Sequence, residues 1–108
     1  MMPRWLFAST PEAVTPITVR VADAEPLHAG TVLARIPGGP YVNHDPTAVG
    51  AVGVARAVLL QDVPGEVGTH QALAITRAAT LVGRHLSDGR GIDRATHRDL
   101  VQNGLKVL

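Results

Sequence analysis

The sequence predicts one mainly β domain with a single helix near the C-terminus, an α+β fold. Short runs of alternating, β-branched residues, which are typical of strands, recur along the 108-residue chain. All eight prolines lie at or before Pro64, so turns divide the first part of the chain. Only Asp93–Asn103 combines an acidic start with a glycine stop, Gly104 at the position after the helix.

The first predicted strands are separated by turn residues. They are Ile17–Val21, Thr31–Ile36 and Tyr41–Asn43. Alternation in the second strand places Val32 and Ala34 on one face and Leu33 on the other. The PGGP sequence at 37–40 cannot continue a strand ladder and favours a turn.

The apolar segment Ala51–Leu60 is compatible with two structures. Its alanines and leucines favour a helix, whereas its valines and Gly53 favour a strand buried on both faces, which we predict here. Gly53 itself is expected to mark a bulge or close backbone packing. Further strands are predicted at Ala72–Thr76, Ala79–Val82 and Leu105–Leu108.

Residues 1–15 show no sustained periodicity and are predicted to be a flexible arm, followed by one β-rich domain at 16–108. The domain's core must be aliphatic, because the chain has only one Trp, one Tyr and one Phe. A small aliphatic core favours an oligomer, in which subunit contacts add burial.

The candidate chemical residues are better explained as structural ones. His44 and Asp45 precede a proline in a turn-like sequence, and the five histidines, His28, His44, His70, His85 and His97, show no metal-ligand spacing. Neither a nucleophile elbow nor a phosphate-loop glycine pattern is present. We therefore expect no catalytic residues, metal or cofactor, and no enzyme activity.

Other function classes also lack support in the sequence. The net charge is +1 without a clustered basic patch, which argues against nucleic acid. No apolar run approaches the length of a membrane span or a signal peptide, so a soluble protein made in the cytoplasm is expected.

Read in order, several segments resemble the head decoration proteins of lambda-like tailed bacteriophages. The matching segments are Gly30–Leu33 (GTVL), Gly39–Val42 (GPYV), Asp45–Ala48 (DPTA), Gly53–Val63, Leu73–Leu81 (LAITRAATL), Leu86 and Gly104–Val107 (GLKV). The resemblance rests on their order, spacing and total length. The chain departs at Glu25–Ala29, where family members often have a glycine-rich or polar segment.

The resemblance implies a β-clip-like fold with a small α/β portion, assembled as a homotrimer. Such trimers bind the major capsid protein on the outer surface of the expanded head and hold it against internal DNA pressure. The arm is expected to become ordered on the shell by strand addition. Deletion of residues 1–13 is expected to abolish capsid binding and to leave the melting behaviour nearly unchanged.

The capsid-binding residues expected from this resemblance lie in the arm and the first strand. They are Trp5, Leu6, Phe7, Val14, Ile17 and Val19. The alternatives are a small homo-oligomeric interaction module of the host without catalytic activity, or a small hydrolase using His44 or His85.

Overall fold

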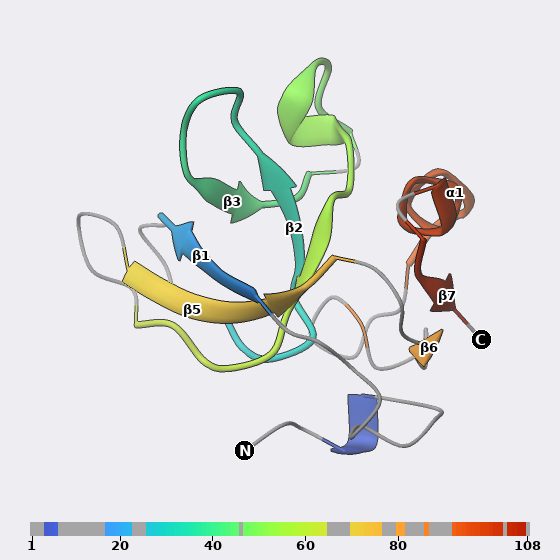
Figure 1. The fold of residues 1–108 in the computed structure, drawn as a ribbon. Helices are drawn as coiled ribbons and strands as arrows, with labels where there is room; N and C mark the ends of the chain where they lie inside the picture. Colours follow the sequence, from blue (N-terminus) through green and yellow to red (C-terminus); the bar gives the residue numbers. More distant parts are fainter. Residues whose placement is uncertain are drawn as a thin grey trace.

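The computed structural model describes residues 4–6, 17–22, 26–45, 47–64, 70–76, 80–81, 86, 92–102 and 104–107. Its centre is a closed barrel with the strand order β1-β3-β2-β4-β5 (Figure 1). The barrel strands are β1 (Ile17–Val21), β2 (Val32–Arg35), β3 (Tyr41–Asn43), β4 (Ala57–Leu59) and β5 (His70–Ile75). The remaining elements are η1 (Arg4–Leu6), η3 (Ala51–Gly53), β6 (Thr80–Leu81), α1 (Arg94–Gln102) and β7 (Lys106–Val107). The predicted mainly β fold with one C-terminal helix is confirmed.

The two edges of β1 differ in how many of its residues are paired with a neighbouring strand. β1 pairs with β5 along its whole length, from Ile17 opposite Ala74 to Val21 opposite His70. On its other side it meets β3 in parallel at a single pair, Val21 with Tyr41. Only the last residue of β1 pairs with the first residue of β3. On this edge of β1, residues 17–20 therefore have no strand pairing among the described residues.

The barrel wall separates two hydrophobic cores. Strand alternation sends Leu33 and Leu59 into the interior, whereas their neighbours Val32 and Val58 point outward. The inner core comprises Val19, Val21, Leu27, Leu33, Ala57, Leu59, Val63, Ala72 and Ala74. The outer core comprises Leu6, Val32, Ala55, Val58, Leu60, Ile75, Leu81, Leu86, Leu100 and Leu105. Both faces of the central strands are therefore buried, which explains their nearly continuous apolar sequence.

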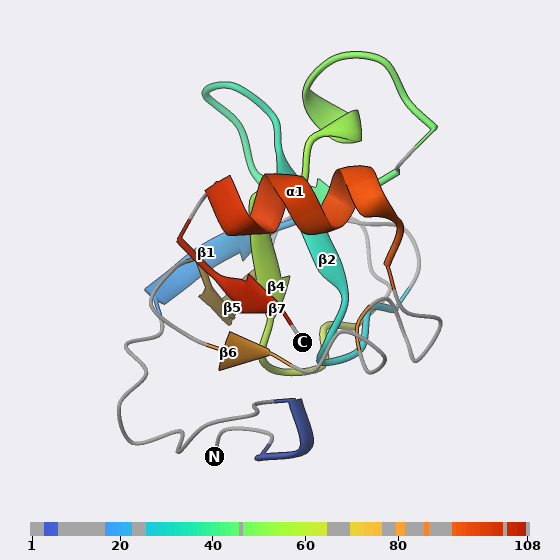
Figure 2. The same cartoon turned by 90° about the vertical axis from the view of Figure 1, so that its right-hand side faces the viewer.

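The outer core is covered by α1 together with β6 and β7, which pair in parallel (Figure 2). Asp93 caps the helix, since its Oδ1 accepts the Thr96 backbone N–H at 2.8 Å. At the other end Gly104 has φ 95°, its N–H bonds to Val101 O at 3.0 Å, and the Leu105 N–H bonds to Leu100 O at 3.1 Å. These bonds form a Schellman cap, so the predicted glycine stop is confirmed.

The structure corrects the prediction of one strand over Ala51–Leu60. Residues 51–53 form the short helix η3, and only Ala57–Leu59 pairs as a strand. Gly50 has φ 89°, a conformation that ends extended structure, and the Val54 N–H bonds back to Ala51 O at 3.2 Å. A Cβ on Gly53 would collide with the Ala48 carbonyl, which confirms close backbone packing there.

Candidate functional site

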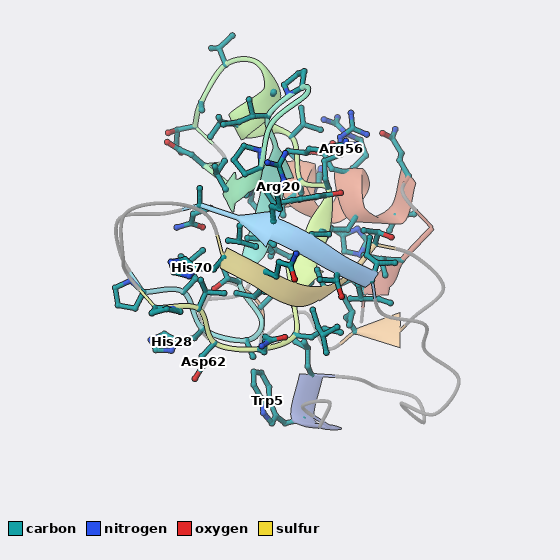
Figure 3. The ribbon with its side chains drawn as sticks, turned by 60° about the vertical axis from the view of Figure 1, so that its left-hand side comes forward. Trp5, Arg20, His28, Arg56, Asp62 and His70 are labelled. Carbon is teal, nitrogen blue, oxygen red and sulfur yellow. The ribbon has the colours of Figure 1, made fainter. Side chains whose placement is uncertain are left out.

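The N-terminal segment contacts the domain through Leu6. Leu6 lies in η1 and is fully buried in the outer core, whereas the adjacent Trp5 is 50% exposed. Figure 3 shows the side chain of Trp5 projecting from η1 at the lower edge of the molecule. For Leu6 the structure therefore corrects the expectation of a free arm. Phe7 and Val14, the other arm residues expected to bind a capsid, lie outside the described residues.

The two candidate residues of β1 differ in what they can offer a partner. The side chain of Val19 points into the barrel and is buried in the inner core, so only its backbone could contact another protein. Ile17 is 41% exposed. Both lie in the part of β1 whose second edge has no strand pairing in the described chain. Such an edge can accept a further strand.

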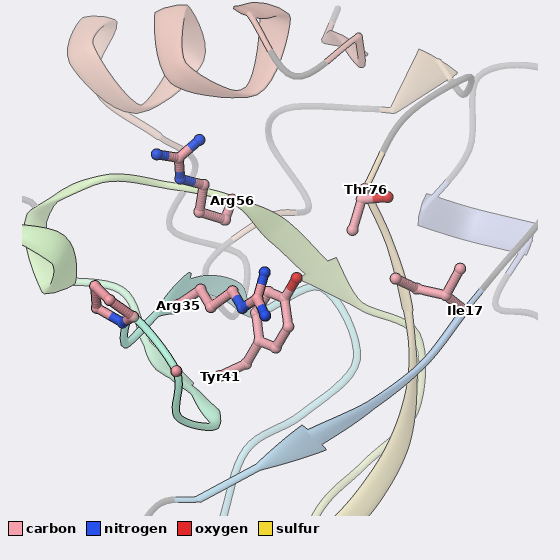
Figure 4. A pocket seen from close by; sticks show the side chains of 7 residues that line it. Ile17, Arg35, Tyr41, Arg56 and Thr76 are labelled. Carbon is pink, nitrogen blue, oxygen red and sulfur yellow. The ribbon is translucent and has the colours of Figure 1, made fainter.

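An open hollow lies where β1 and the β2–β3 hairpin separate, and we call it the seam hollow (Figure 4). Its volume is about 590 Å³. The lining comes from β1, β2 and β3, from the hairpin turn, and from the residues that border β4 and β5: Ile17, Arg35, Pro37, Gly38, Tyr41, Arg56 and Thr76. The hollow exists because the barrel closes through only one residue pair at this seam.

The lining of the seam hollow carries positive charge. The guanidinium of Arg35 lies over the ring of Tyr41, 5.9 Å from its centroid, in a cation–π arrangement. Figure 4 shows the Tyr41 hydroxyl directed toward the gap bordered by Ile17 and Thr76, with Arg56 at the rim nearest α1. None of the described lining residues is acidic.

His44 and Asp45 form a turn, as the sequence predicts. Asp45 Oδ1 accepts hydrogen bonds from the Thr47 hydroxyl at 2.7 Å and the Thr47 backbone N–H at 2.9 Å. These two bonds lower the pKa of the Asp45 carboxyl below its ordinary value. His44 Nε2 lies 3.1 Å from Gly53 O and ties the turn to η3. Both side chains thus hold the loop before β4.

The other described histidines are dispersed. His28 Nδ1 lies 3.8 Å from the exposed carboxylate of Asp62, and His97 Nε2 lies 3.2 Å from Val107 O. His70 is half-buried at the start of β5 (Figure 3), and its Nε2 is buried without a hydrogen-bond partner. In the part of the chain that the structure describes, no group of three His, Asp or Glu residues is placed to hold a metal. His85 lies outside it.

None of the helices that the structure describes is long and apolar enough to cross a membrane.

Sequence reasoning missed the residues of the seam hollow other than Ile17. Arg35, Tyr41 and Arg56 carry no shared motif, and they become neighbours only because the barrel closes. The available signals were weak: Tyr41 is the only tyrosine, and Arg35 and Arg56 interrupt apolar runs. Arginine within an apolar strand sequence marks a position that faces solvent or a partner.

Comparison with known proteins supports the resemblance that the sequence suggested. The family model described as bacteriophage lambda head decoration protein D matches residues 1–108. No curated protein matches the chain significantly.

Proposed function

Since the chain belongs to the bacteriophage lambda head decoration protein D family, we propose that it binds the expanded head as trimers and stabilises the shell against internal DNA pressure. The coarser role follows from membership: it is a structural protein that decorates the phage capsid and is located there. The family match favours this role over a host interaction module. The finer proposal places the trimers on the outer surface, bound to the major capsid protein, and gives the barrel with its helical layer a β-clip-like fold.

The open edge of β1 is the observation that carries the proposed mode of binding. Residues 17–20 use one edge to pair with β5, and their second edge has no strand pairing among the described residues. An added strand would gain main-chain hydrogen bonds with little demand on side-chain identity. The segment 1–15 leads directly into this strand. We therefore infer that the arm and β1 together contact the shell.

If the arm binds the shell, the side chain of Leu6 either stays in the domain's own core or leaves it to contact the shell. In the free domain this side chain is fully buried, so it contributes to the protein's own stability. Trp5 already exposes half of its surface and can contact a shell without leaving its place. We infer that Trp5, Phe7, Val14 and Ile17 contact the shell through side chains and Val19 through its backbone, while Leu6 anchors the segment or is released on binding.

Trimers would convert weak contacts into durable attachment. Three arms on one trimer bind at high effective concentration once the first is attached. A three-fold protein can use the same patch three times on a three-fold site. The exposed apolar side chain of Ile36 is available for subunit or shell contacts.

The central test is decoration of expanded, undecorated shells by the purified protein. We expect bound copies in multiples of three at three-fold positions, and decorated shells that break at higher temperature than bare ones. Single copies at each site, or an unchanged breaking temperature, would contradict the trimer and the stabilising role respectively.

The arm is tested by a double variant that leaves Leu6 in place. Trp5→Ala with Phe7→Ala should keep a folded domain and weaken shell binding, because it removes two large apolar contacts. Val49→Ala, at the exposed loop, is the matched surface control. Full occupancy by the double variant would place the attachment site on the folded body instead.

A further inference from the structure

We propose that the seam hollow is a specificity site that takes a carboxylate side chain from an extended segment of the shell protein. The inference rests on the proposed function, because it identifies the chemistry of the partner segment at the open edge of β1. The hollow and that edge share Ile17, so a strand added along residues 17–20 borders the hollow. Side chains on one face of an added strand would then point toward it.

The charge of the lining selects an anionic group. The guanidinium of Arg35 borders the hollow beside Tyr41, and none of the described residues around the hollow is acidic. Guanidinium groups bind carboxylates through paired, charge-assisted hydrogen bonds that are stronger than neutral ones. The Tyr41 hydroxyl, directed toward the gap in Figure 4, can donate a further hydrogen bond.

Arg35 is held in position before a partner arrives. Its stacking over the Tyr41 ring restricts the side chain, so less conformational freedom is lost on binding. Tyr41 is itself fixed, because it is half-buried against the inner core and its backbone accepts a hydrogen bond from Ala22 at 2.9 Å. Arg35 therefore loses less conformational freedom on binding than an exposed arginine whose side chain has no stacking partner.

The surroundings favour a protein carboxylate over a nucleic-acid phosphate. The volume of about 590 Å³ is sufficient for an acidic side chain with its backbone, and Ile17 and Pro37 supply apolar contacts to that backbone. Phosphate-backbone binding needs a broad basic surface, whereas the chain's net charge is only +1.

Charge removal on the shell tests the proposal. The variant Arg35→Gln should weaken binding to expanded shells by about tenfold and reduce its salt dependence. Arg98→Gln is the matched control, because Arg98 lies on α1 with its side chain 67% exposed. It should bind within about twofold of the unmodified protein. If Arg35→Gln binds as tightly as the control, the inference is wrong while the proposed function stands.

A second measurement does not depend on shells. A blocked Val-Glu-Val peptide, titrated into the protein, should shift the amide resonances of Ile17, Arg35 and Tyr41, whereas Val-Gln-Val should leave them unchanged. Arg35→Gln should abolish the shifts. Equal shifts with both peptides, or none with either, would overturn the inference. Peptide binding without any binding of the protein to shells would instead support the site and refute the proposed function.

Discussion

Leu6 shows how a single residue can link an N-terminal segment to a domain. It follows a half-exposed tryptophan and precedes residues outside the described structure, yet its side chain is completely buried. Its neighbours in the outer core come from the barrel, from Leu86 and from the C-terminal layer. Removal of residues 1–13 would therefore remove part of the core, so we expect it to lower the melting temperature, in contrast to the nearly unchanged melting expected from the sequence.

Leu6→Ala should lower the free energy of unfolding by about 2–5 kcal/mol, because it leaves a cavity among well-packed aliphatic side chains. Urea unfolding followed by circular dichroism measures the change. Val49→Ala, at a fully exposed side chain, is the control and should change stability by less than about 0.5 kcal/mol. An equally small effect at Leu6 would mean that the N-terminal segment does not pack against the core in solution.

Gly53 makes a second residue-scale prediction. Gly53→Ala should destabilise the protein by about 2–3 kcal/mol, since the new methyl group would collide with the Ala48 carbonyl and force the backbone to move. Gly38→Ala is the comparison. Gly38 has φ +72° but open space around it, so only backbone strain of about 1 kcal/mol is expected. Thermal unfolding of both variants measures the difference, and a smaller effect at Gly53 than at Gly38 would contradict the packing.

At the scale of elements, α1 is tied to the barrel by polar contacts as well as by Leu100. Asp99 is largely buried, and its Oδ2 accepts a hydrogen bond from the Ala55 backbone N–H at 3.1 Å. The helix start depends on Asp93, whose pKa is lowered by hydrogen bonds from the Thr96 side chain and backbone. The covering helix is thus positioned at its start by its cap and near its end by the barrel.

The Asp93 cap predicts a pH dependence with a defined sign. Because the folded-state pKa lies below the unfolded value, the cap stabilises the protein above about pH 4 and loses its effect as the pH falls through the folded-state pKa. Asp93→Ala should cost about 0.5–1 kcal/mol at pH 7, given the exposure of the group, and less at pH 2. Asp93→Asn, an uncharged cap, should cost less than Asp93→Ala at pH 7. A cost of Asp93→Ala that is constant across this range would contradict the assignment.

At the scale of the whole molecule, the two cores share the barrel wall. Val58 belongs to the outer core and Leu59 to the inner one, although they are adjacent in β4. Loss of either core would expose the other face of the same strands. The barrel and its covering layer should therefore unfold together, in one cooperative transition.

Trp5 provides a reporter for this cooperativity, because it is the only tryptophan and lies next to Leu6. Its fluorescence and the far-ultraviolet circular dichroism should change with the same midpoint and slope in urea. A fluorescence change that precedes the circular dichroism change would show that the N-terminal segment detaches independently.

Local sequence signals determined much of this fold. Alternating β-branched residues predicted β1 and β2, and Asp93 and Gly104 marked the ends of α1 because caps act within a few residues of the helix. The turn at His44 and Asp45 was likewise predicted from the local sequence. The family resemblance was confirmed by a match over residues 1–108.

Tertiary structure decided what depends on contacts between distant residues. The Ala51–Leu60 segment forms a short helix and a strand. Gly50 has a positive φ and Gly53 packs against the Ala48 carbonyl, and helix or strand propensities describe neither feature. Leu6 belongs to the same buried cluster as Leu81, Leu86 and Leu100, and no periodicity near residue 6 encodes its place there. The seam hollow exists only because β1 and β3 meet at a single pair, which places Arg35 and Ile17 around the same hollow. Register and barrel closure arise from packing over the whole chain, so local sequence patterns cannot specify them.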